Sequence, residues 1–174
     1  MKQHNGMRPL DIAVLLKIAI ADDGWLNKDL SNSLYISTSE ISESLNRSKI
    51  AGLIDPSKRK VFRNNLLDFL SYGLVYVFPV EPGALVRGIP TAHSAPILKN
   101  GLISNEIYVW PSSSGIEKGQ AIQPLYPNAI LAVQQDARLY DLLALVDSIR
   151  IGRVRDKALA IEKLKTIIKA EYAH

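Results

Sequence analysis

The chain has 174 residues, 47% of them hydrophobic and 22% charged, so it can bury the core of about one globular domain. It contains no cysteine, which excludes disulfides and thiolate metal sites, and its three histidines are far apart, which argues against a zinc site. The net charge is only +4, but residues 46–63 carry six bases against one acid. A partner with phosphates, bound by this segment, is the first expectation.

The chain begins with a pattern of short helices. Arg8, Pro9 and Asp11 are typical of a helix start and predict a helix over residues 10–21, whose body is apolar nearly all round. Such a helix is expected to lie buried at the centre of the fold. A second helix is expected over residues 27–34.

A third helix follows after a short turn. Ser37 or Thr38 can cap it, and Glu40 lies at the spacing of a capping box. Gly52 stops it after residue 49 or 51.

The next segment combines a turn with positive charge. Residues 55–57 (Asp-Pro-Ser) are a turn signal, and Lys-Arg-Lys follows at 58–60. A fourth helix is expected over residues 64–72. Residues 74–78 and 84–89 then predict a β-hairpin.

The middle of the chain is rich in glycine, proline and serine and predicts strands and loops, with one strand at residues 108–111. Helices return at the end: Asp136 caps a helix over residues 138–149, and after Gly152 a last helix covers residues 154–170.

The two C-terminal helices carry apolar stripes. The stripes consist of Leu139, Leu142, Leu143 and Val146, then Ile161, Leu164, Ile167 and Ile168. One stripe can cover the rest of the monomer, and the second predicts a homodimer interface. The alternative is a helical hairpin folded back on its own domain.

Residues 28–54, KDLSNSLYISTSEISESLNRSKIAGLI, carry a family resemblance. The matching positions are Leu30, Leu34, Ile36, Ser37, Ile41, Leu45 and the exit Gly52-Leu53-Ile54. The segment resembles the helix-turn-helix of winged-helix transcriptional regulators, and most of all the MarR-like group. The resemblance covers about residues 10–60 and implies DNA binding. It departs at Ser48, where that family usually has leucine, so the helix is expected to end early or to pack loosely there.

The third helix also has a polar face suited to a DNA groove. If Ile41 and Leu45 point inward, the opposite face at about 100° per residue holds short polar groups that can read base edges. Asn46 can pair with adenine, Arg47 with guanine and Glu43 with the amine of cytosine. The alternative is a three-helix core with an ordinary solvated polar face.

The basic residues after this helix are expected to contact phosphates beside the groove, although a run of basic residues alone is also typical of a solvated turn. Hydroxyl groups at the helix start can contact phosphate as well. The predicted DNA-binding residues are Ser37, Thr38, Ser39, Ser42, Glu43, Asn46, Arg47, Lys49, Lys58, Arg59, Lys60 and Arg63.

No motif of catalysis is found. His93 lies among Gly, Pro, Ser and Ala in residues 88–96 without a spaced triad or a nucleophile elbow, so a structural or partner-contacting loop is expected. Arg150, Arg153 and Arg155 surround Gly152, which favours a helix C-terminus, with a second nucleic-acid contact as the alternative. We expect a non-enzyme without a metal or other cofactor.

The sequence therefore predicts an α+β protein with an N-terminal winged helix-turn-helix, a β-rich middle and C-terminal helices. The expected regions are 1–63 for DNA binding, 64–128 as wing or partner-binding region, and 129–174 for dimerisation. The expected function is a cytoplasmic, sequence-specific regulator that binds double-stranded DNA, a repressor acting as a homodimer. No apolar run is long enough to span a membrane. Alternatives are an antitoxin-like or adaptor protein that binds a partner protein through the middle while also binding its operator, and a small-molecule sensor.

Overall fold

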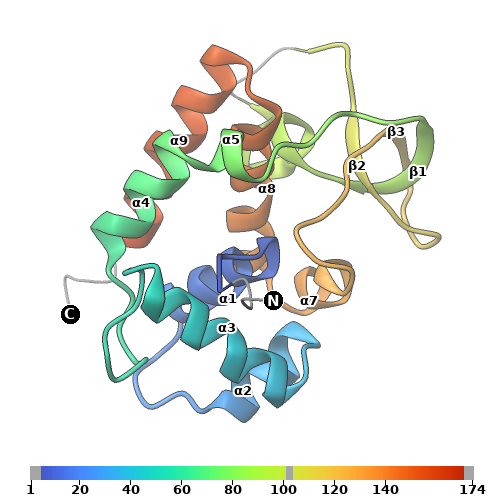
Figure 1. The fold of residues 1–174 in the computed structure, drawn as a ribbon. Helices are drawn as coiled ribbons and strands as arrows, with labels where there is room; N and C mark the ends of the chain where they lie inside the picture. Colours follow the sequence, from blue (N-terminus) through green and yellow to red (C-terminus); the bar gives the residue numbers. More distant parts are fainter. Residues whose placement is uncertain (1–4, 101–103, 171–174) are drawn as a thin grey trace.

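The computed structural model describes residues 5–100 and 104–170 and has the predicted α+β class (Figure 1). The elements in chain order are α1 Pro9–Ala19, α2 Asn27–Leu34, α3 Thr38–Ile50, α4 Arg63–Tyr72, α5 Leu74–Val77, β1 Leu85–Pro90, a 3₁₀ turn Ala92–Ser94, α6 Pro96–Lys99, β2 Tyr108–Pro111, β3 Glu117–Ala121, α7 Ala129–Gln135, α8 Ala137–Ile151 and α9 Val154–Ala170. Figure 1 shows α1, α2 and α3 together in the lower part of the molecule and the strands at the upper right.

Two helices form the centre of the core. The residues from Ile12 to Leu16 in α1 are fully buried, as the all-round apolar pattern predicts. Every residue of α8 from Leu142 to Arg150 is buried as well. One apolar cluster joins side chains from all three expected regions, for example Ile12, Trp110 and Leu164. The regions therefore share a core.

Helix α9 packs against both α8 and α4. Its residues Ala160, Leu164 and Ile168 are buried, and Ile161 and Ile167 are partly buried against the same core. Both C-terminal stripes are thus covered within the chain, in the arrangement of a hairpin folded back on its own domain. The uncovered stripe that motivated a dimer interface here is not present, and the homodimer itself stays a prediction.

The three short strands close on one another. Strand β1 pairs antiparallel with both β2 and β3, with Ile89 opposite Trp110 and Val86 opposite Gly119, and β2 pairs in parallel with β3. Gly88 lies where β1 meets β2: a Cβ there would come within 2.0 Å of the carbonyl oxygen of Trp110. Only glycine permits this close approach.

The predicted hairpin of residues 74–78 and 84–89 is wrong. Residues 74–77 form the short helix α5, because the chain continues from α4 through Gly73 with helical bonds such as Phe78 N–H to Leu74 O, 2.9 Å. The second half of the prediction holds, because β1 covers residues 85–90. Helix α7 has no counterpart among the predicted elements.

A buried carboxylate connects the strands to α8. Asp147 is fully enclosed, and its oxygens accept hydrogen bonds from Thr91 (2.8 Å), Trp110 Nε1 (2.6 Å) and Arg150 (2.9 Å). Burial raises the pKa of Asp147, and the three donors oppose that shift. The Arg150 guanidinium also donates to the carbonyl oxygens of Phe78 and Gln123. This Asp147–Arg150 cluster therefore links five segments of the chain.

We expect Asp147→Ala to lower the free energy of unfolding by about 3–5 kcal/mol, because it leaves Arg150 buried without its counter-charge. The neighbouring Ser148→Ala is the matched control: the Ser148 hydroxyl is buried without a hydrogen-bond partner among the described residues, so its removal should cost less than about 1 kcal/mol. Urea unfolding measures both. Equal losses in the two variants would contradict the assigned role of Asp147.

Candidate nucleic-acid interface

Helices α2 and α3 are joined by a tight turn. Tyr35 ends α2 in the left-handed conformation, at φ 57°, and Ile36 turns inward to the core. The Ser37 hydroxyl accepts a hydrogen bond from the Glu40 N–H at 3.2 Å, so the predicted cap of α3 is confirmed. This local geometry sets the direction in which α3 leaves the turn.

The inward direction of α3 is also as predicted. Ile41 and Leu45 are buried in the core, and Ser44 and Ser48 lie on the same side. The helix does not end early at Ser48 but continues to Ile50, and the Ser48 hydroxyl lies 4.0 Å from the sulfur of Met7. The exposed residues of α3 include six of the predicted DNA-binding positions: Thr38, Ser39, Ser42, Glu43, Asn46 and Lys49.

Arg47 is not part of the exposed face, and its prediction as a guanine-reading residue is wrong. Its side chain is 8% exposed and makes two hydrogen bonds to the fully buried Asp11, Nε to Oδ2 at 2.9 Å and Nη2 to Oδ1 at 2.8 Å. The hydrogen bonds to Asp11 raise the pKa of Arg47. A carboxylate buried in the apolar helix α1 requires a cation, and Arg47 supplies it.

Two further carboxylates surround the same guanidinium. Glu40 lies 3.4 Å and Glu43 lies 3.8 Å from Arg47, and Arg8 approaches Glu40 to 3.7 Å. The N-terminal half of α3 thus carries paired charges. The positive charge of this surface has to come from the end of α3 and from the segment after it.

Positive charge on this surface is concentrated in the turn that follows α3. Residues 55–60, here named the basic turn, are closed by a bridge between Ile54 and Val61. The Asp55 carboxylate organises the turn from inside: Oδ1 accepts the N–H groups of Arg59 (2.7 Å) and Lys60 (2.8 Å), and Oδ2 accepts the Ser57 hydroxyl. These bonds lower the pKa of Asp55 to about 2.

Two cations of the basic turn are directed by side-chain contacts. Lys58 donates to the Asn46 amide oxygen and so joins the turn to the exposed face of α3. Arg59 stacks over the Trp25 ring, 4.9 Å from its centroid, and donates to the Trp25 carbonyl oxygen at 2.7 Å. Lys60 is exposed. The basic turn is therefore held between α3 and the segment before α2.

Arg63 is half-buried and contacts the end of α9, and its assignment to DNA binding stays a prediction. Its guanidinium donates to the Ile168 carbonyl oxygen at 2.5 Å, near the end of α9. It thus satisfies a carbonyl at a helix C-terminus, which also favours positive charge.

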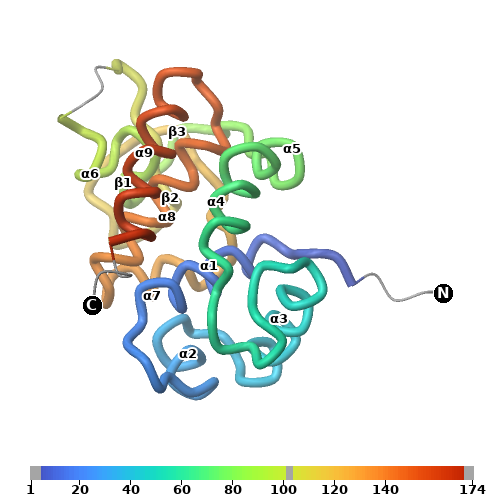
Figure 2. Tube along the Cα trace, turned by 90° about the vertical axis from the view of Figure 1, so that its left-hand side faces the viewer, coloured from blue at the N-terminus to red at the C-terminus, as the bar shows by residue number. Residues whose placement is uncertain are grey.

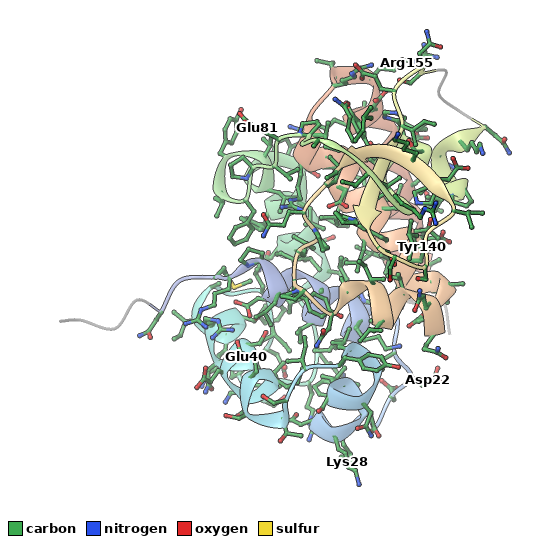
Figure 3. All side chains as sticks on the ribbon, turned by 90° about the vertical axis from the view of Figure 1, so that its right-hand side faces the viewer. Asp22, Lys28, Glu40, Glu81, Tyr140 and Arg155 are labelled. Carbon is green, nitrogen blue, oxygen red and sulfur yellow. The ribbon has the colours of Figure 1, made fainter. Side chains whose placement is uncertain are left out.

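The remaining candidates lie far from α3. His93 is buried, with Nε2 2.7 Å from the Glu106 carbonyl oxygen and Nδ1 3.6 Å from Asp156. Arg150 belongs to the Asp147–Arg150 cluster, and Arg153 pairs with Glu106. Figure 3 shows Arg155 at the opposite end of the molecule from Glu40 and Lys28. None of these contacts involves a residue of α3.

Sequence reasoning missed two contributors to this surface, Asp55 and Trp25. The Asp-Pro-Ser turn signal located Asp55, and an aspartate at that place commonly accepts its neighbours' N–H groups. Nothing in the sequence pairs Trp25 with Arg59, because their contact spans 34 residues.

No protein-family model, curated protein or solved structure matches the chain. None of the described helices combines the length and the apolar composition of a membrane span. Within residues 5–100 and 104–170, no three His, Asp or Glu side chains are grouped so that they could hold a metal ion.

We expect Arg47→Ala to act on stability, lowering the free energy of unfolding by about 3–5 kcal/mol, because Asp11 would stay buried without a cation. Lys49→Ala removes the same charge from the exposed side of the helix and should change stability by less than about 0.5 kcal/mol. Thermal and urea unfolding test the pair. An unchanged melting temperature for Arg47→Ala would mean that the buried Asp11 does not need the arginine as its counter-charge.

The pKa of Asp55 predicts a local pH dependence. Because its folded value of about 2 lies below the ordinary 3.8, the carboxylate stabilises the basic turn above pH 4, and this contribution is lost as the pH falls through about 2. The amide NMR signals of Arg59 and Lys60 should titrate with a midpoint near 2, and the titration should vanish in Asp55→Asn. A midpoint close to 3.8 would show that the carboxylate does not hold the turn.

Proposed function

We propose that the protein is a sequence-specific DNA-binding regulator of transcription, a repressor acting as a homodimer, and that residues 1–63 form its winged helix-turn-helix region. One observation carries the proposal: the basic turn is joined, through Lys58 and Asn46, to an exposed polar face of α3. A recognition helix enters the major groove while neighbouring segments contact the backbone phosphates, and the basic turn is the segment next to α3.

The composition of the exposed face supports this role. Ser39, Ser42 and Asn46 are short, so the backbone of α3 can approach the floor of a major groove. Amide and carboxylate groups can read base edges, and the serines between them keep the face short. Ser37 and Thr38, at the helix start, are placed to contact a phosphate.

The surface charge supports it as well. Figure 2 shows α3 at one side of the lower part of the molecule, with the chain leading directly from it into the loop before α4. That loop contains the basic turn, and Lys49, Arg59 and Lys60 are exposed at or after the end of α3. Three phosphate contacts would give a log–log salt slope of about −3.

The homodimer requires a surface other than the apolar stripes of α8 and α9, because these stripes are covered within the chain. A two-fold assembly would place two copies of α3 about one DNA turn apart, roughly 34–36 Å.

The test is selection from a pool of randomised duplexes by the full chain at low salt, followed by anisotropy titrations. We expect one sequence to be enriched, and Asn46→Ala to lose about 1–3 kcal/mol of preference for it. Lys60→Ala should weaken binding to all sequences alike and flatten the salt slope by about one unit.

Lys165→Ala is the charge-matched control, because Lys165 is exposed on α9, away from α3. It should leave affinity and salt slope unchanged. If the wild type binds no duplex at low salt, or if Lys165→Ala weakens binding as much as Lys60→Ala, the α3 surface does not bind DNA.

A further inference from the structure

The backbone of the basic turn places Lys58 in an unusual conformation. Its φ is +60°, in the left-handed region that residues with a Cβ rarely adopt. The turn holds it there, because the Lys58 N–H donates to the Asp55 carbonyl oxygen at 2.9 Å and the next two N–H groups bind the Asp55 carboxylate. Such an over-determined strained residue in a turn points to a function for the side chain that it directs.

The side chain of Lys58 has a different environment from the side chains of the two neighbouring cations. Arg59 is directed to Trp25 and Lys60 is exposed, whereas Lys58 is half-buried and its ammonium lies against the Asn46 amide. Asn46 belongs to the exposed face of α3. The ammonium of Lys58 therefore lies beside the face of α3 that would enter the groove.

This contact also fixes the orientation of the Asn46 amide. An ammonium has only donors, so the atom that faces Lys58 has to be the amide oxygen, and the amide nitrogen with its two donors lies on the other branch. A free asparagine reads adenine by accepting from its amino group and donating to N7. With one lone pair of the oxygen already bound to a cation, the Lys58–Asn46 pair presents mainly donors, the remaining ammonium protons and the amide N–H groups, together with a positive charge.

We propose that Lys58 and Asn46 together read a guanine, a step that rests on the proposed function. Guanine is the base whose major-groove edge offers two acceptors, N7 and O6, and lysine donates to both. Adenine would place its amino group against the ammonium, where two sets of donors repel each other. The pair thus replaces the guanine-reading role that Arg47 cannot fill.

The experiment uses the duplex selected by the full chain. Each guanine of that site is replaced in turn by adenine and by 7-deazaguanine, which lacks the N7 acceptor. At one guanine we expect the wild type to lose about 5- to 150-fold in affinity with adenine, the range typical of one good base contact, and to lose affinity with 7-deazaguanine too. In Lys58→Ala the discrimination at that position should fall below about twofold, with the other positions unaffected.

Lys60→Ala is the matched control, because it removes the same charge two residues away. It should weaken every duplex alike and keep the wild-type preference for guanine. If Lys58→Ala behaves as Lys60→Ala does, or if the selected site contains no guanine that responds, Lys58 does not read a base and the DNA-binding function stands without it. If no duplex is selected at all, the proposed function and this assignment fail together.

Discussion

The ion pair of Arg47 and Asp11 is the interaction on which the exposed face of α3 depends. Asp11 is fully buried in α1, and both of its oxygens are bound by the guanidinium of α3. A bidentate pair fixes rotation as well as distance, so α3 can present only one side to solvent. Removing either partner would leave the other charge buried without a counter-charge, so the pair favours this arrangement of α1 and α3. The exposure of the polar side chains of α3 therefore depends on the buried Arg47–Asp11 pair.

The second buried pair acts at the other end of the molecule. Asp147 and Arg150 connect α8 to the 3₁₀ turn region, β2, the end of α5 and the segment after β3. Helix α4 leads from the basic turn to α5, and α9 packs against α4.

The basic turn is anchored on both sides. Val61 is buried directly after it, and the side chains of the turn contact Asn46 and Trp25. A turn held by these contacts can place the Lys58 ammonium against the Asn46 amide.

The helices around the site could be predicted because their signals are local. The Ser37 cap, the stop at Gly52 and the inward pair Ile41 and Leu45 lie within a few residues of one another. The role of Arg47 could not be predicted in the same way. At about 100° per residue it lies toward the outer face, and only the packing of α1 across it, 36 residues away, encloses it. One signal was present: an aspartate in a helix expected to be buried needs a cation, but the sequence does not say which one. The strand prediction for residues 74–78 failed although its signal was local, because β-branched and aromatic residues favour a strand only where a strand partner exists.

The contacts of Arg47 and Arg63 within the fold change the balance between affinity and specificity that the sequence suggests for DNA binding. Counted from the sequence, the six bases of residues 46–63 suggest a surface that binds phosphates strongly and with little selectivity. In the fold, Arg47 binds Asp11, Arg63 binds the Ile168 carbonyl oxygen, and Lys58 binds the Asn46 amide. Under the proposed function, Lys49 and Lys60, with Arg59 beside Trp25, would meet phosphates, so non-specific attraction would be weak and would fall only moderately with salt. Under the proposed function most of the discrimination has to arise in the groove, from the groups that α3 and Lys58 present. Since one chain offers so few of these contacts, a second copy on the same duplex would supply the affinity that a single surface lacks.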